Sequence, residues 1–150
     1  MFRALWGDIL TGRLQRLPFL GWYLVIVLLT LVLGFVLGAL VGAAERMAGG
    51  ESLKTEVALE ASLGPVGLIV VAAVFALLLL GQLNIMAKRV RDMGLPAAWL
   101  FALGWLLLSG LLSTAGGPAL GGLLSLVVLL ALLFIPTGAF GKGVAGPTQA

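Results

Sequence analysis

Three long stretches of this chain contain no charged side chain, and they define its architecture. Asp, Glu, Lys and Arg are absent between Arg16 and Glu45, between Glu60 and Lys88, and between Asp92 and Lys142. Leu, Val, Ala, Phe and Gly fill these stretches, and each is long enough to cross a hydrocarbon core of about 30 Å as a helix. The pattern therefore predicts an all-α integral membrane protein.

We predict four transmembrane helices in a single membrane domain. The spans cover residues 20–43, 65–86, 96–112 and 118–135, and residues 136–150 form a cytoplasmic tail. The third uncharged stretch is too long for one crossing, and the turn residues of Ser113–Pro118 divide it in two. Apolar residues at helical spacing in the polar segment 45–63 predict a short surface helix that begins near Ser52. Lys88–Gly94 is expected to form a tight polar connection.

Residues 1–19 are predicted to lie in the cytoplasm and at the membrane surface. Within residues 1–11 the apolar residues follow the spacing of an amphipathic helix. These apolar residues are Phe2, Leu5, Trp6, Ile9 and Leu10. Such a helix, with an aromatic residue and nearby arginines, suits the headgroup layer. The alternatives are a flexible N-terminus and a cleaved signal peptide. The first apolar run is too long and begins too late for a typical signal peptide.

The distribution of charge predicts the orientation. With four spans, one face carries seven basic and two acidic residues, which are Arg3, Asp8, Arg13, Arg16, Lys88, Arg89, Arg91, Asp92 and Lys142. The opposite face carries two basic and four acidic residues, which are Glu45, Arg46, Glu51, Lys54, Glu56 and Glu60. Because Lys and Arg collect on the cytoplasmic side, both termini are predicted to be cytoplasmic.

Composition excludes several kinds of chemistry. The chain has no Cys and no His, so it has no disulfide, no thiol nucleophile and no His- or Cys-based zinc, copper or haem site. We therefore expect no catalytic residues, no cofactor and no metal. The net charge of +3 reflects the basic cytoplasmic helix ends rather than nucleic-acid binding, because no sizeable basic and aromatic surface is present.

Two features inside the spans are candidates for helix packing. Gly34, Gly38 and Gly42 form a ridge of small residues at spacings of four along the first span. Glycines let helix backbones approach closely, so this ridge is expected to pack against another helix of the chain or of a partner. Gln82 and Asn84 are the most polar groups at depth, and an interhelical hydrogen bond is their expected role, with ligand contact as the alternative.

The basic residues near the second span are the candidates for surface contacts. Lys88, Arg89 and Arg91 are expected to act as topology determinants. Asp92 does not help orientation, so we expect it to cap the next helix or to pair with Arg13 or Arg16. The alternative function of this region is to hold an anionic lipid headgroup among Arg13, Arg16, Lys88 and Arg89.

Two segments of the chain resemble the signatures of a known family. Gly12–Phe19 contains Gly-Arg-x-x-Arg followed by an aromatic residue, and Lys88–Gly94 precedes Trp99. Together they resemble domain of unknown function 805, a family of small bacterial inner-membrane proteins. The matching positions are Gly12, Arg13, Arg16, Phe19, Arg89, Asp92, Gly94 and Trp99. Arg91 stands at the family's His position, which excludes His-dependent chemistry here.

The resemblance implies a location in the bacterial inner membrane but no activity. It also implies that the two signatures face each other at the inner surface. We expect them to form a structural cluster there, named the signature cluster: Gly12, Arg13, Arg16, Lys88, Arg89, Arg91, Asp92, Gly94 and Trp99.

The sequence favours a non-enzymatic inner-membrane protein, either an accessory subunit of a larger membrane complex or a self-associating scaffold that acts through helix packing. The alternative is a small channel, exporter or permease component, but Thr30, Gln82, Asn84, Ser109 and Ser125 are few polar residues for a pathway. A lipid-modifying enzyme with Asp92 as base is disfavoured, because neighbouring cations keep the carboxylate ionised. The expected partners are anionic lipids and a membrane protein or second copy.

Overall fold

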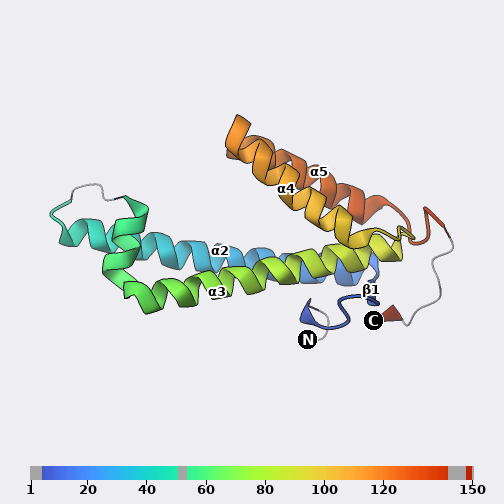
Figure 1. The fold of residues 1–150 in the computed structure, drawn as a ribbon, viewed down its shortest axis with the longest axis horizontal. Helices are drawn as coiled ribbons and strands as arrows, with labels where there is room; N and C mark the ends of the chain where they lie inside the picture. Colours follow the sequence, from blue (N-terminus) through green and yellow to red (C-terminus); the bar gives the residue numbers. More distant parts are fainter. Residues whose placement is uncertain (1–4, 51–53, 142–147, 150) are drawn as a thin grey trace. The chain divides into compact units, whose positions relative to one another are not determined.

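Four helices and one pair of very short strands make up the part of the chain that the structure describes (Figure 1). The computed structural model describes residues 5–50, 54–141 and 148–149. The helices are α2 (Arg16–Met47), α3 (Thr55–Asp92), α4 (Ala98–Gly116) and α5 (Pro118–Phe134). Strands β1 (Arg13–Leu14) and β2 (Thr148–Gln149) pair in parallel, with Arg13 opposite Thr148. The predicted all-α class is confirmed.

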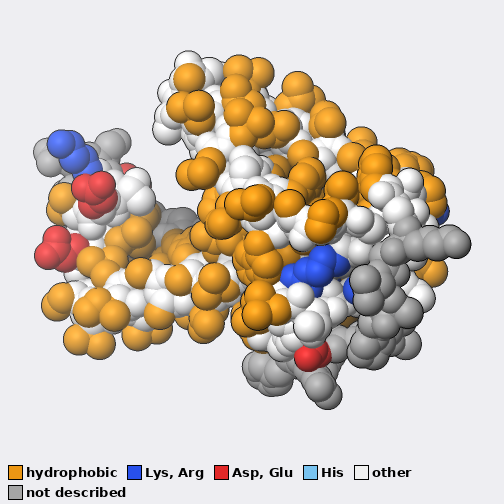
Figure 2. All heavy atoms as spheres, turned by 45° about the vertical axis from the view of Figure 1, so that its right-hand side comes forward, with side chains coloured by type: hydrophobic (Ala, Val, Ile, Leu, Met, Phe, Trp, Pro, Cys, Tyr) orange, Lys and Arg blue, Asp and Glu red, His pale blue; other side chains and the backbone are white. Residues whose placement is uncertain are grey.

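Three of the helices are long and apolar enough to cross a membrane. These are α2, α3 and α4, whereas α5 is a shorter apolar helix of 17 residues. Their outward side chains are hydrophobic: the side chain of Phe35, for example, is 81% exposed. Figure 2 shows hydrophobic side chains over much of the visible surface. A surface of this kind is stable in lipid and would aggregate in water, as expected for a membrane protein.

The chain divides into two compact units. One unit, here called the terminal unit, contains Met1–Leu24 and Leu80–Ala150, and the other, the central unit, contains Val25–Leu79. The signature cluster belongs entirely to the terminal unit, and the glycine ridge belongs entirely to the central unit.

The central unit contains a sharp kink in α3. Gly64 has a φ of 64° and a ψ of 177°, which separates a first helical segment, 55–63, from the long apolar segment that begins at Pro65. Proline is tolerated at the start of a helix, where its missing N–H would have had no partner. A helical segment is present at 55–63, where the sequence predicts a short helix, and the apolar segment begins at the predicted residue Pro65. The predicted helix start near Ser52 lies outside the described residues.

In the terminal unit, α4 and α5 form a tight helical hairpin. Gly117, with a φ of 85°, is the only residue between the two helices, which pack side by side (Figure 1). Gly121 makes this approach possible, because a Cβ there would lie 2.7 Å from the Ser109 carbonyl oxygen. The predicted break after residue 112 is therefore too early: α4 continues to Gly116 before the chain turns.

The predicted interfacial helix at residues 1–11 does not extend over its full length. Residues 1–4 lie outside the described part, and of the remainder only Leu5 and Trp6 are helical. Asp8 has a positive φ of 47°, and the Gly12 N–H donates to the Asp8 carbonyl oxygen at 2.9 Å, so this segment turns instead. Leu5 is 5% exposed, which means that it packs inside the protein.

The expectation of a connecting loop at Lys88–Gly94 is also wrong for most of its length. Lys88–Asp92 form the last residues of α3, and Met93 and Gly94 form the turn that ends the helix. The Gly94 N–H donates to the Arg91 carbonyl and the Leu95 N–H to the Val90 carbonyl, at 3.0 and 3.3 Å. This pair of bonds is a Schellman motif, which requires a left-handed residue, and Gly94 supplies it with a φ of 97°.

Candidate functional site

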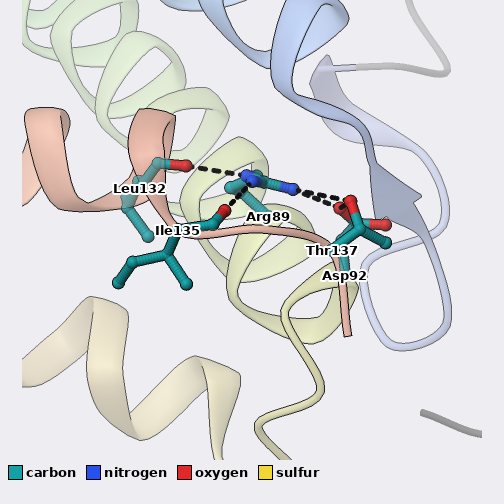
Figure 3. A network of polar contacts seen from close by, with 5 residues as sticks. All are labelled: Arg89, Asp92, Leu132, Ile135 and Thr137. Carbon is teal, nitrogen blue, oxygen red and sulfur yellow. Dashed lines mark hydrogen bonds and ion pairs between the residues drawn. The ribbon is translucent and has the colours of Figure 1, made fainter. Parts of the chain in front are cut away.

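A buried arginine joins three segments at the end of α3 (Figure 3). Arg89 is 0% exposed, and its Nε donates to the Leu132 carbonyl oxygen at 2.8 Å. Its Nη2 donates to the Ile135 carbonyl oxygen at 2.6 Å, so the guanidinium caps the C-terminal end of α5. The last carbonyls of a helix have no partner within it and carry partial negative charge, which a cation stabilises.

Asp92 completes this network. Its carboxylate pairs with Nη1 of Arg89 and accepts a hydrogen bond of 2.8 Å from the Thr137 hydroxyl. Both members of the pair are buried, and they lie three residues apart on one helix. The structure thus places Asp92 against Arg89 rather than against Arg13 or Arg16. We call Arg89, Asp92, Thr137 and the carbonyls of Leu132 and Ile135 the arginine clamp.

The segment after α5 packs against the end of α3. The Gly138 N–H donates to the Asp92 carbonyl at 2.9 Å, and the Phe140 N–H donates to the Met93 carbonyl at 3.0 Å. A Cβ on Gly94 would lie 2.8 Å from the Gly141 carbonyl oxygen, so the two backbones are in close contact there. The first residues of the predicted tail are therefore a folded part of the terminal unit.

The two sequence signatures meet through Arg91. Its Nη1 donates to the Gly12 carbonyl oxygen at 2.7 Å, and its Nη2 donates to the Ile9 carbonyl oxygen. The Trp99 indole N–H donates to the same Ile9 carbonyl at 3.0 Å. Arg91 and Trp99 thus hold the N-terminal segment against the connection between α3 and α4.

Lys88 faces the same N-terminal segment. Its side chain is buried, its Cε would lie 2.8 Å from a Cβ on Gly12, and Asp8 attracts its charge. Position 12 therefore has no room for a side chain, and Gly12 permits the close packing. Because Lys88 and Arg89 are both buried, they do not present their charges to a lipid headgroup. Arg13 is half-buried in β1, and Arg16 is exposed.

Asn84 makes a contact that links distant parts of the sequence. Its side-chain amide donates to the carbonyls of Leu5 and Gly7, at 2.8 and 3.2 Å. Asn84 is buried and its hydrogen bonds are internal, as expected from the sequence, but the acceptors lie in the N-terminal segment rather than in another predicted span. No pattern in the sequence identifies carbonyl acceptors of this kind.

A groove of about 390 Å³ follows the α4–α5 hairpin, and we call it the polar groove after the Gln and Ser side chains among its mainly apolar lining. Three of the five polar residues singled out above as candidates for a pathway line it, namely Gln82, Ser109 and Ser125. The hydroxyls of Ser109 and Ser125 donate to carbonyls of their own helices, at 3.1 and 2.9 Å. Thr30 and Asn84 lie elsewhere.

The glycine ridge in the central unit is open. No described atom lies within 4 Å of a Cβ built on Gly34 or Gly38. At Gly42 the nearest atom is Nη2 of Arg46, whose Nε donates to the Gly42 carbonyl at 2.9 Å. The ridge therefore has room for the backbone of another helix.

Comparisons with known proteins identify a family and nothing closer. A family model described as "Protein of unknown function (DUF805)" matches residues 9–142. No curated protein and no solved structure matches the chain. Among the described residues, no group of three or more acidic side chains could hold a metal ion.

Proposed function

Because this chain belongs to the DUF805 family of proteins of unknown function, and carries apolar helices that fit a membrane protein, we propose that it is a non-enzymatic, multi-pass protein of the bacterial inner membrane. It associates through the glycine ridge of α2, either with a larger membrane complex as an accessory subunit or with a second copy as a scaffold. The observation that carries this proposal is the open ridge.

The ridge has the properties of a helix-binding surface in lipid. Lipid tails are as apolar as Leu, so transmembrane helices associate through close packing, which small residues permit. Gly34 and Gly38 lie one turn apart and have no described atom within 4 Å of a built Cβ. Phe35 stands exposed beside them and offers apolar contact area to a partner helix.

The proposed topology has four spans and cytoplasmic termini. Contacts inside the terminal unit support it, because Arg91 joins residues 9 and 12 to the end of α3. Arg89 brings the end of α5 to the same place. An α5 that returns to this point crosses the membrane if α4 does. Reporter fusions at residues 50 and 150 test this topology. We expect the two reporters on opposite sides of the membrane, and reporters on the same side would contradict the proposal.

The state of Asp92 supports a non-enzymatic role. Its carboxylate is already engaged by Arg89 and Thr137, and it is buried. A general base must lie within hydrogen-bond reach of the substrate proton that it removes. The Asp92 carboxylate is instead buried and bonded to groups of its own chain, which supports a role of the clamp in folding rather than in catalysis.

Leucine substitutions on the ridge test the proposal. Gly34→Leu and Gly38→Leu should each convert the native assembly, extracted in mild detergent, into the free monomer, as measured by native mass spectrometry. Gly21→Leu is the matched control, since this glycine also has no described atom within 4 Å of a Cβ but lies outside the ridge. An assembly that survives both ridge variants contradicts the proposal.

Cross-linking locates the contact. The chain has no Cys, so a single cysteine at Ala39 or at Leu20 is the only thiol in the protein. We expect Ala39→Cys, beside the ridge, to form a disulfide-linked dimer or a cross-link to a partner with a cysteine, and Leu20→Cys to form neither.

A second candidate function is transport, and the polar groove favours it. Gln82, Ser109 and Ser125 share one groove on the α4–α5 hairpin, whereas isolated polar residues would offer no pathway. Gln82→Leu in proteoliposomes tests this: loss of a flux that the wild type shows would support transport. A purified assembly that conducts nothing in planar bilayers would exclude it.

A further inference from the structure

A second hollow in the terminal unit lies where α4 begins. It has a volume of about 370 Å³ and is lined by Leu10, Arg91 and residues 96–100. It is separate from the polar groove and from the arginine clamp, with which it shares no residue. The proposed association through α2 does not involve it.

Arg91 gives this hollow a positive charge. Its guanidinium donates to the carbonyls of Gly12 and Ile9, which are neutral groups. Among the described residues no carboxylate pairs with Arg91, whereas Arg89 is paired with Asp92 and Lys88 is attracted to Asp8. Arg91 is half-buried and partly exposed, so its charge is available to an anion.

The first turn of α4 adds hydrogen-bond donors to the same hollow. The first bond within the helix runs from the Phe101 N–H to the Ala97 carbonyl, at 3.0 Å. The N–H groups of residues 98–100 precede it, and no described side chain caps them. Unpaired N–H groups and the positive end of the helix dipole attract an anion, and here they act beside an arginine.

The flanks of the hollow are apolar and exposed. Leu10 is 78% exposed and Leu100 is 73% exposed. Trp99 also lines the hollow, and its indole N–H donates to the Ile9 carbonyl oxygen. Tryptophan in this setting is typical of the membrane interface. A ligand that fits must therefore carry a negative head and apolar chains.

We propose that this hollow binds the phosphate of an anionic phospholipid, held by Arg91 and by the N–H groups of residues 98–100, with the acyl chains along Leu10 and Leu100. This is a different location from the group of basic residues expected from the sequence, of which Lys88 and Arg89 are buried. The site requires membrane insertion but not the helix partner proposed for α2.

Lipid retention by the full-length protein tests the proposal. The protein is purified in detergent with equal amounts of phosphatidylglycerol and phosphatidylethanolamine, and native mass spectrometry counts the lipids that remain bound. We expect the wild type to retain phosphatidylglycerol in preference. Arg91→Gln should lower that retention about fivefold, the effect of removing one basic residue from contact with an anionic surface.

Ala97→Asp removes the ligand without removing Arg91. Ala97 is the N-cap residue of α4, and an aspartate there supplies its own carboxylate to the free N–H groups and to the arginine. This variant should lose phosphatidylglycerol as Arg91→Gln does, while its melting temperature equals or exceeds that of the wild type. If Ala97→Asp fails to fold, Ala97→Leu, which fills the hollow, replaces it.

Arg46→Gln is the matched control, because this arginine is exposed and belongs to the central unit. It should leave lipid retention unchanged. Equal retention of the two lipids by the wild type would overturn the proposal. So would a folded Ala97→Asp variant that retains as much phosphatidylglycerol as the wild type. The Gly34→Leu and Gly38→Leu variants are judged by the mass of the assembly and not by bound lipid. Failure of the α2 proposal can therefore be distinguished from failure of the lipid proposal.

Discussion

The two units of this chain differ in how far their polar contacts reach along the sequence. In the terminal unit, Arg89 bonds to a residue 43 positions away, and Arg91 to one 79 positions away. In the central unit, Thr30 and Arg46 each bond to a carbonyl four residues back on their own helix.

This difference shows which unit determines its own tertiary structure. Burial of apolar surface does not drive helices together in lipid, so long-range polar bonds and close packing must do so. The terminal unit has both, at the arginine clamp and at the α4–α5 hairpin. The central unit has mostly local polar bonds and an open glycine ridge, which leaves space beside α2.

The largest expected effect is from Arg89→Met. Removal of the guanidinium leaves the Asp92 carboxylate and two helix-end carbonyls buried without their donor, which costs about 3–5 kcal/mol. Arg46→Met in the central unit removes an exposed arginine and should change stability by less than about 0.5 kcal/mol. Unfolding in mixed detergent micelles measures both. Equal losses would show that the two units do not differ in this way.

A double-mutant cycle sharpens the assignment of the ion pair. Asp92→Asn should cost about 2 kcal/mol, since hydrogen bonds to charged groups are among the stronger ones. Combined with Arg89→Met, the two losses should fall short of additivity by about 1–3 kcal/mol, because the residues are in contact. Combined with Arg16→Gln they should add. The reverse pattern would restore Arg16 as the partner of Asp92.

Alanine at two glycines should have opposite effects in the two units. Gly94→Ala places a Cβ in a left-handed conformation and against the Gly141 carbonyl, which costs about 1–3 kcal/mol. Gly38→Ala, in an open helical position, should stabilise the isolated chain by up to about 1 kcal/mol. Thermal unfolding of the dissociated protein gives both signs. A stabilising Gly94→Ala would contradict the turn described here.

The smallest effect is expected from Thr137→Val. This substitution keeps the shape of the side chain and removes its hydrogen bond to Asp92, and should cost about 1 kcal/mol. The same variant in an Asp92→Asn background should cost less, since the acceptor charge is already gone. A loss of about 1 kcal/mol in both backgrounds would mean that Thr137 acts through packing alone.

The architecture could be predicted from the sequence because charge and periodicity act locally. Uncharged stretches, Pro65 at a helix start and the turn residues before Pro118 each leave a signal within a few residues. The ends of helices were less predictable. Lys88–Asp92 were assigned to a connection on polarity alone, yet they are helical because their polar groups have buried partners.

The pairings inside the signature cluster could not be predicted for a different reason. The three cations near the end of α3 have similar chemistry, and their partners depend on the direction in which each side chain leaves the helix. Arg89 bonds to the end of α5, Arg91 bonds to Ile9 and Gly12, and Lys88 is attracted to Asp8. The acceptors are mostly backbone carbonyls, which every residue has. The sequence signatures therefore predict which residues form the cluster, but only the structure shows which of them contact each other.

The arginine clamp has a consequence for the order of events during synthesis. The Leu132 carbonyl that Arg89 requires is made 43 residues later, which at ribosomal rates of about 5–20 residues per second is an interval of about 2–9 s. During that interval Arg89 and Asp92 can pair with each other but lack the partners that follow Leu132 in the chain, Ile135 and Thr137. A nascent chain that stalls before α5 therefore has the Arg89–Asp92 pair without the hydrogen-bond partners that Leu132, Ile135 and Thr137 supply in the finished protein.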